Sequence, residues 1–408
     1  MVTRMEDLPQ ESVCNILSRL PARELLKCKC VCKSWFNLIT DPHFISNYYV
    51  TYNNLIYSQN QEEHLLVIRR PFISGIRTYI SLLSWSLNDP KNHVSSSLLN
   101  FPDEYISDYK YWTEIMGPCN GIYFLQGNPN IMMNPSLRQF KALPESHLTD
   151  LNVEYSLTDF AGFGFDPKSN DYKVVVLKDL WLKKTDERQK GYWNVELYSL
   201  NSNSWRKLDI DEHPLGIEIS GSSSRVYTYV NNCCHWWGFV DESSSRIEDI
   251  VLAFNMVDES FRKIKVPKIG YSCFSGECFK TLAPFHEYDT IGVIVYPLRG
   301  NAKFFDVWVM KDYYDEMSWI KQYSVGPIPM ISKFVGFYGS NGFLCLDKNE
   351  RLVLYESEYE NTMDLHVYGK HDSIRVVRYM ESLVLLQRGS QRSHRCFSCR
   401  LVPDPLLI

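Results

Sequence analysis

A strand-and-turn unit that recurs four times restricts the fold of this chain more than any other feature. Each copy has an apolar strand, a polar turn, an aromatic residue, and then basic and apolar residues. The copies occupy residues 131–143, 195–208, 251–264 and 307–321. Their aromatic residues, Phe140, Trp205, Phe261 and Trp319, are 65, 56 and 58 residues apart. A single hairpin of this kind cannot bury its inner face, so the spacing predicts four-stranded blades packed radially in a kelch-like β-propeller.

The rest of the chain beyond about residue 50 has the same antiparallel β character. Apolar and polar residues alternate in short runs bounded by Gly, Pro, Asn, Asp and Ser, as in Tyr172 to Leu177 and Ile250 to Phe254. A weaker fifth copy begins at Arg351. Dividing about 350 residues by the repeat spacing predicts about six blades, within a range of six to eight. A β-sandwich with long insertions is the alternative fold.

The first 48 residues follow a helical period instead. Apolar residues at helical spacing form three groups, which are Val13, Ile16, Leu17 and Leu20; Leu25 and Leu26; and Val31, Trp35, Leu38 and Ile39. Pro21 ends the first group and Asp41-Pro42 the last, because proline lacks the N–H that the next helical turn needs. The pattern predicts three short helices in a module too small to bury its own apolar surface, so the module should dock on a partner.

Charge and hydropathy exclude several classes of protein. The formal net charge of −5 argues against a broad nucleic-acid-binding surface. No window of 18 consecutive apolar residues exists, so a membrane span is not expected. The first ten residues contain no apolar export segment. We therefore expect the cytoplasm, or the nucleus, with the 12 cysteines reduced and mostly serving as small apolar side chains.

No motif in the chain points to catalysis, a metal or a cofactor. The glycines of Gly162-Phe163-Gly164-Phe165 lack the third glycine and the helix of a dinucleotide site, and the stretch is interpreted as a strand. Cys28, Cys30 and Cys32 would point to different sides of a helix. The tail motif of His394, Cys396 and Cys399 lacks a fourth zinc ligand. His235-Trp236-Trp237 is interpreted as blade packing rather than a ligand contact.

The helical module resembles the F-box. The resemblance rests on Glu6-Asp7-Leu8-Pro9, on Ile16-Leu17-Ser18-Arg19-Leu20-Pro21, and on the stretch Cys30-Val31-Cys32-Lys33-Ser34-Trp35, in this order and spacing. It implies a helix-in-groove surface for the adaptor Skp1, which links F-box proteins to cullin 1. The residues expected to divide between internal packing and Skp1 binding are Leu8, Pro9, Val13, Ile16, Leu17, Leu20, Pro21, Leu25, Leu26, Val31, Trp35 and Leu38.

The remainder is similar to the F-box-associated domain of plant F-box proteins. The matching stretches are Cys119-Asn120-Gly121-Ile122, Asn134-Pro135, Gly162 to Asp166 with Asp171 to Val175, and Val307 to Met310. Trp308-Val309-Met310 with Asp312-Tyr313, and the ending Tyr379 to Val384, resemble the S-locus F-box group of pollen self-incompatibility. The expected domains are the F-box at 1–48, the propeller at 49–386 and an extension at 387–408.

The resemblance implies a non-catalytic substrate receptor of an SCF-type ubiquitin ligase, with pistil S-ribonucleases as substrates. The alternatives are a plant F-box receptor for another protein, a Skp1-bound scaffold outside the ligase, and a propeller enzyme. An enzyme would need converging acidic or metal-binding residues, and the sequence shows no such cluster.

Long polar loops are the expected substrate contacts, because a propeller presents variable loops on a rigid scaffold. They are 100–112, 178–192, 211–225 and 270–280. Residues 49–408 carry 37 basic and 43 acidic residues, a net charge of −6, which would favour encounter with a basic ribonuclease. The candidate steering residues are Asp103, Glu104, Asp108, Asp211 and Glu212.

Overall fold

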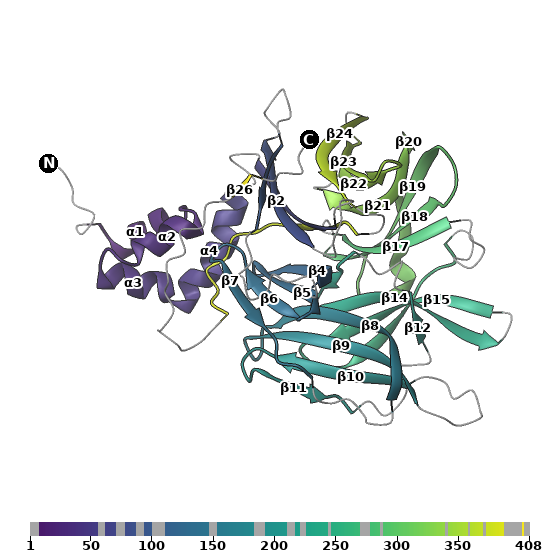
Figure 1. Cartoon of the computed structure of the whole chain (residues 1–408), viewed down its shortest axis with the longest axis horizontal. Helices are drawn as coiled ribbons and strands as arrows, with labels where there is room; N and C mark the ends of the chain where they lie inside the picture. The colour runs from purple at the N-terminus through teal and green to yellow at the C-terminus, as the bar shows by residue number, and fades with distance from the viewer. Residues whose placement is uncertain are drawn as a thin grey trace. The chain divides into compact units, whose positions relative to one another are not determined.

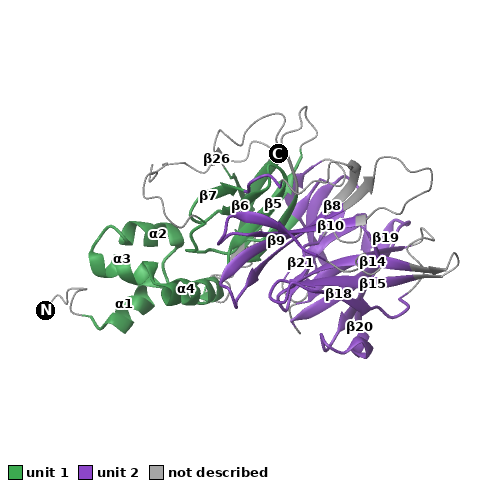
Figure 2. Cartoon of the chain, turned by 90° about the horizontal axis from the view of Figure 1, so that it is seen from below, with its two compact units in different colours: residues 1–142, 376–408 green, residues 143–375 purple. Residues whose placement is uncertain are grey.

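The structure, a computed structural model, consists of two compact units, residues 1–142 with 376–408 and residues 143–375 (Figure 2). It describes residues 8–55, 62–70, 78–86, 94–99, 111–146, 153–182, 192–209, 217–220, 226–243, 246–269, 278–285, 289–338, 342–357, 360–369, 373–386 and 402–403. Within these ranges no helix is both long and apolar enough to cross a bilayer.

Four helices, one more than predicted, begin the first unit (Figure 1). They are α1 (Gln10–Leu17), α2 (Ala22–Cys28), α3 (Lys33–Thr40) and α4 (Pro42–Leu55). The expected break at Asp41-Pro42 ends α3 but also starts α4. Pro42 is the first residue of α4, where a missing N–H costs nothing. The Asp41 carboxylate accepts hydrogen bonds from the amides of His43 and Phe44, at 2.8 and 3.2 Å, as an N-cap does.

Two antiparallel sheets complete the first unit. Blade A contains β1 (Glu62–Arg69), β2 (Tyr79–Ser86), β3 (Ser95–Leu98), β25 (Arg375–Arg378) and β26 (Val402–Pro403), in the order β25-β1-β2-β3-β26. Blade B contains β4 (Tyr111–Cys119), β5 (Ile122–Asn128), β6 (Ile131–Asn134) and β7 (Gln139–Ala142). Blade A therefore joins early strands of the chain to β25 and β26 from its last part.

The second unit contains four further antiparallel sheets. Blade C has β8 (Val153–Asp166), β9 (Asp171–Leu182), β10 (Tyr192–Ser199) and β11 (Ser204–Lys207). Blade D has β12 (Ile217–Ile219), β13 (Tyr229–Val230), β14 (Cys233–Ser243), β15 (Arg246–Asn255) and β16 (Phe261–Lys265). Blade E has β17 (Cys278–Phe285), β18 (Thr290–Pro297), β19 (Ala302–Met310) and β20 (Trp319–Pro329). Blade F has β21 (Ile331–Tyr338), β22 (Gly342–Asp347), β23 (Arg351–Glu356) and β24 (Asn361–Tyr368).

Six antiparallel blades after a small helical module confirm the predicted fold class, a β-propeller of six blades. The repeated aromatic residue has the same register in four of them, where it opens the last hairpin of the blade. The cross-strand pairs are Met133 with Phe140, Tyr198 with Trp205, Phe254 with Phe261, and Met310 with Trp319. In blade F the equivalent partner of Tyr355 is Thr362, which explains why the fifth copy is weak.

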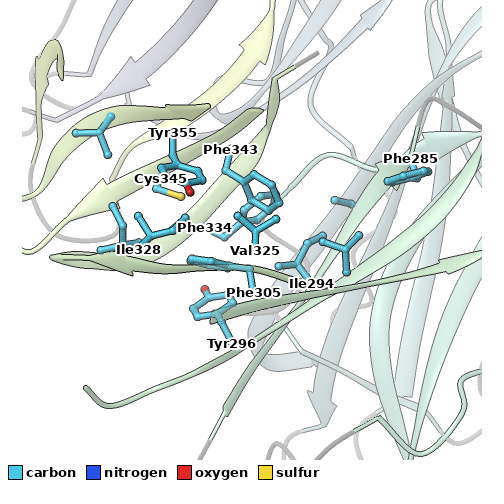
Figure 3. Close-up of a cluster of buried hydrophobic side chains, with 14 of the residues drawn as sticks. Phe285, Ile294, Tyr296, Phe305, Val325, Ile328, Phe334, Phe343, Cys345 and Tyr355 are labelled. Atoms are coloured by element: carbon cyan, nitrogen blue, oxygen red, sulfur yellow. The ribbon is translucent and has the colours of Figure 1, made fainter. Parts of the chain in front are cut away.

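Apolar side chains of neighbouring blades fill the space between them, as the contact of blades E and F illustrates (Figure 3). Phe305 of β19 lies 5.8 Å from Phe343 of β22 between ring centroids, and 6.5 Å from Phe334 of β21. All three side chains are fully buried. Burial of large aromatic rings at these distances stabilises the contact between one blade and the next.

Candidate functional site

The helical module has its own apolar core, which separates the residues that face inward from those that face solvent. Val13, Leu17, Leu25 and Ile39 are buried in this core. Three aromatic residues of α4 extend it, with Tyr48 stacked on Tyr52 at 5.2 Å between ring centroids. Leu383, from the segment after β25, is fully buried in the same cluster. The unpredicted helix α4 and a distant segment thus supply part of the core that three short helices lack.

The twelve residues predicted to bind Skp1 fall into three groups. Val13, Leu17 and Leu25 are buried in the core. Leu8, Leu20, Trp35 and Leu38 are partly buried against it. Pro9, Ile16, Pro21, Leu26 and Val31 are exposed. The structure therefore shows which of the twelve residues lie in the core of the module, and the last group consists of those with exposed side chains.

Two exposed apolar residues were missed from the sequence. Phe36 of α3 is 49% exposed and Val50 of α4 is 57% exposed. Phe36 follows Trp35 directly, so it lies about 100° around the helix from Trp35 and outside the predicted apolar stripe. The sequence feature that could have identified Phe36 is its position as an apolar residue on α3 outside the stripe that faces the core. Ile16, Leu26, Val31 and Phe36 together define what we call the exposed apolar set of the module.

The three thiols near the end of α2 do not act as one group. Cys28 is partly buried in the module, whereas Cys30 and Cys32 are exposed. Burial, and to a lesser extent the Glu24 carboxylate, raises the pKa of the Cys28 thiol, which disfavours the thiolate that a metal would need. The tail motif of His394, Cys396 and Cys399 lies outside the described residues.

The residues predicted to bind substrate, Asp103, Glu104, Asp108, Asp211 and Glu212, also lie outside the described residues. The strands that flank their loops show where the loops leave the blades. In blade A, Leu98 at the end of β3 pairs with Ser81 near the start of β2. The segment after β25 leaves from the opposite edge, where the Tyr379 amide donates to the His64 carbonyl at 2.8 Å. The connection 99–110 thus starts at one end of the strands of blade A, and that segment leaves from the other end.

In the second unit, three predicted loops share one edge. The strands of each blade alternate in direction, so the connections β9–β10, β11–β12 and β16–β17 all leave from the same end. The short turns 167–170, 200–203 and 256–260 lie at the other end. The predicted loop 211–225 is corrected in one respect, because β12 (Ile217–Ile219) interrupts it, so that only the part before β12 shares an end with the other two connections.

Carboxylates converge inside the second unit, but cations neutralise them. The ammonium of Lys173 lies 2.8 Å from Asp166 and 2.9 Å from Glu259, and it also donates to the carbonyl of Met256 at 2.9 Å. Arg206 forms a further ion pair with Glu259. Burial alone would raise the pKa of Asp166, but hydrogen bonds from Lys173, Ser169 and two backbone amides outweigh it and lower the pKa to about 2. This network joins blade C to blade D and resembles a structural tie rather than an acid–base site.

His235 is a second buried polar group of the second unit. Its Nε2 lies 2.7 Å from the hydroxyl of Tyr313, and its Nδ1 lies 3.4 Å from the carbonyl of Thr228. Burial lowers the pKa of His235 to about 3, so the ring is neutral at pH 7. Trp236 and Trp237 beside it are buried too, in agreement with blade packing. Among the described residues, no group of three or more His, Cys, Asp or Glu could hold a metal ion.

The order of the two parts, a helical module followed by a six-bladed β-propeller, is the one expected of an F-box protein with an F-box-associated domain. The chain matches the F-box domain over residues 5–47 and the F-box associated beta propeller domain over residues 72–403. The second match spans most of the chain, so the protein belongs to the F-box-associated β-propeller family of F-box proteins.

Proteins similar to this chain are found in Arabidopsis thaliana. The F-box/kelch-repeat protein At3g23880 is 26% identical over 81% of this chain and 81% of its own length. The F-box protein CPR1 is 24% identical over 94% of this chain and 90% of its own length. Among solved structures, an oligogalacturonate lyase in complex with manganese matches 73% of this chain and 77% of its own, with 10% identity and a TM-score of 0.38. That likeness is too remote to bear on function.

Proposed function

We propose that this protein is the substrate-recognition subunit of an SCF-type ubiquitin ligase. The helical module, within residues 1–48, holds a Skp1-like adaptor and through it cullin 1. The propeller, within residues 49–386, holds a protein whose lysines are thereby brought to the ubiquitin-loaded enzyme. The chain itself does no chemistry, because the gain is proximity. The ligase works in the cytoplasm or the nucleus, and residues 387–408 are an extension of the receptor.

The exposed apolar set carries the adaptor half of this proposal. Ile16, Leu26, Val31 and Phe36 come from three successive helices and the turn between them, and they are 36% to 65% exposed. The core beneath is already filled, so these side chains are not needed for the fold of the module. Exposed apolar residues gathered on so small a module indicate a protein-binding surface. The buried Val13, Leu17 and Leu25 support that surface from below.

The second part of the proposal, recognition of a substrate protein, rests on where the long loops leave the blades. In blade A the connection 99–110 leaves from the edge away from the segment that contacts the F-box helices. In the second unit the connections that follow β9, β11 and β16 begin at matching ends of blades C and D, which supports a common recognition face. Long polar loops on a rigid scaffold are suited to recognising a protein. The acidic residues in these loops remain candidates for attracting a basic partner.

A narrower proposal is that the substrates are pistil S-ribonucleases. It rests on the resemblance of Trp308 to Tyr313 and of Tyr379 to Val384 to the S-locus group. In the structure these residues have internal roles, with Val309 and Met310 buried in β19 and Tyr313 bonded to His235. Their burial indicates a role in the fold of the family, although Asp312 between them is exposed. The broader proposal is a receptor for a protein substrate, and binding of the full-length chain to pistil ribonucleases, against unrelated basic proteins, tests the narrower one.

Adaptor binding is tested with the exposed apolar set. We expect Ile16→Ala with Phe36→Ala to weaken Skp1 binding at least about tenfold, because truncation of a central hot-spot residue costs about 2 kcal/mol or more. Affinity for purified Skp1 is measured by calorimetry, and far-UV circular dichroism checks the fold. The matched control is Met317→Ala, which removes a 90% exposed apolar side chain in blade E and should leave Skp1 affinity unchanged.

If the variant with Ile16→Ala and Phe36→Ala bound Skp1 with wild-type affinity, the proposed Skp1-binding surface would be wrong. Leu8→Ala with Pro9→Ala tests the start of α1 in the same assay and should also abolish Skp1 binding. Co-purification of cullin 1 with Skp1 and the full chain supports the ligase, whereas Skp1 without cullin would support a scaffold. An activity that survives removal of Skp1 and cullin would favour a propeller enzyme.

A further inference from the structure

The segment after β25, residues 379–386, lies between the F-box helices and blade B. In Figure 1 it is the yellow stretch that passes beside α4 and β7. Its backbone and side chains bond to α2 and α4 on one side and to blade B on the other. All of these contacts lie within the first unit. The segment is more than 300 residues from the helices in sequence, so its position is a tertiary property of the chain.

On the helical side, Glu381 is the centre of the contact. One carboxylate oxygen accepts hydrogen bonds from the Ala22 amide at 2.6 Å and from the Tyr48 hydroxyl at 3.0 Å. Asn53 of α4 pairs with the backbone of Glu381 in both directions. Its side-chain NH₂ donates to the Glu381 carbonyl at 3.0 Å, and its oxygen accepts from the Glu381 amide at 2.9 Å. Charge-assisted and paired hydrogen bonds of this kind fix orientation as well as distance.

On the blade side, Asn134 and Ser136 hold the same segment. The Asn134 side chain donates to the carbonyls of Ser382, at 3.2 Å, and Val384, at 2.8 Å. The Ser382 amide donates to the Ser136 hydroxyl at 3.0 Å. Gly121 lies so close that a Cβ there would be 2.4 Å from the Ser382 side chain. The segment is thus wedged against blade B with no space for an added methyl group.

Apolar packing completes the contact. Leu383 is fully buried among Val13, Leu17 and the aromatic residues of α4, and Leu137 of blade B packs on the same cluster. The core of the F-box module therefore includes side chains from both the segment and blade B. Burial of the carboxylate raises the pKa of Glu381, which shows that the group is withdrawn from solvent.

We propose that residues 379–384 are a rigid joint that fixes the F-box module on the propeller, and that Glu381 and Asn53 are its positioning residues. The inference rests on the proposed ligase function, because a fixed orientation selects which lysines of a bound protein the ubiquitin-loaded enzyme reaches. The joint itself is a property of the chain alone and is testable without the ligase.

The first test measures amide hydrogen exchange in the full chain. In Asn53→Ala with Glu381→Ala, the peptide containing Ala22 should exchange about tenfold or more faster, because the amide loses a charged acceptor. Glu381→Gln keeps an oxygen for Ala22 and Tyr48 and should restore slow exchange. Asn54→Ala, an exposed neighbour on α4, is the matched control. Unchanged exchange in the double variant would overturn the joint. If the double variant fails to accumulate, Glu381→Ala alone gives the same comparison, because it also removes the acceptor of the Ala22 amide.

The second test measures the consequence in the reconstituted ligase. The wild-type chain should acquire ubiquitin on a restricted set of its own propeller lysines, identified by mass spectrometry. The double variant should bind Skp1 with unchanged affinity but spread the modification over more lysines. An identical lysine pattern, despite faster exchange at Ala22, would overturn the positioning role. If the wild-type chain did not bind Skp1, the proposed function would be wrong, but the result of the hydrogen-exchange test would still apply to the joint.

Discussion

Single glycines in blade C show how closely neighbouring blades approach at the residue scale. A Cβ on Gly164 would lie 2.4 Å from the Tyr229 ring and 2.8 Å from Met256 of blade D. The Tyr229 ring cannot yield easily, because its hydroxyl accepts from the Phe165 amide at 3.1 Å and donates to the Phe165 carbonyl at 2.8 Å. The glycine pattern that superficially suggested a nucleotide site therefore serves strand-to-strand packing.

We expect Gly164→Ala to lower the free energy of unfolding by about 1–3 kcal/mol, the usual cost of overpacking. Urea denaturation followed by tryptophan fluorescence measures it. Gly336→Ala is the matched control, because a Cβ there meets nothing within 4 Å. The control should be neutral or slightly stabilising, since alanine restricts the unfolded chain. Equal stability of the Gly164 variant and the wild type would refute the packing argument.

At the scale of elements, ion pairs join neighbouring blades in addition to the apolar contacts between them. Lys173 of β9 contacts Asp166 of its own blade and Glu259 of blade D, and both lysine and aspartate side chains are nearly inaccessible. A buried pair of this kind gives geometric specificity more than net stability, but removing one member leaves an uncompensated charge.

Lys173→Met should accordingly destabilise the protein by about 3 kcal/mol at pH 7. In the wild type, the pKa of Asp166 is about 2 in the folded state, below its ordinary value of 3.8. Its contribution to stability is therefore complete above about pH 4 and is lost as the pH falls towards 2. The variant should show a weaker acid dependence, because Ser169 and two backbone amides still bond to Asp166; denaturation at a series of pH values measures it. Lys321→Met, which breaks an exposed pair with Asp306, should change stability by less than about 1 kcal/mol.

For the whole molecule, the last part of the chain has two structural tasks. β25 takes the first place in blade A, before β1, and the residues after it hold the F-box module. Several stretches that identified the family meet here, since Gly121 and Asn134 both contact residues 380–384. The family signature in this region is thus largely the signature of a structural contact.

A chain ending at residue 386 should unfold like the full-length protein, because the described part of the removed segment, residues 402–403, contributes a two-residue pairing of β26 with β3. A chain ending at residue 374 should lose the cooperative transition, because blade A then lacks β25 and the module lacks Leu383 and Glu381. Thermal melts followed by circular dichroism compare the two. A sharp, wild-type melt of the shorter chain would show that β25 is dispensable.

The sequence by itself determined the local features of this protein. Alternation of apolar and polar residues, the recurring aromatic residue and the turn chemistry act over a few neighbours, so they specify strands, hairpins and the blade repeat without knowledge of distant residues. The F-box motif is equally local, which is why its helices and its apolar residues were recognisable in advance. The helix α4 was missed because Asp41-Pro42 is compatible with both the end of one helix and the start of another.

Only the tertiary structure decided which of those residues are covered. Leu17 and Ile16 are adjacent and similarly apolar, yet one is fully buried and the other 40% exposed. Likewise, no local pattern places β25 beside β1 or Glu381 on Ala22, because these contacts join parts of the chain more than 300 residues apart. Local preferences set the blades and helices. Long-range burial and hydrogen bonding set how the first and last parts of the chain are joined, since those energies exist only once distant segments meet.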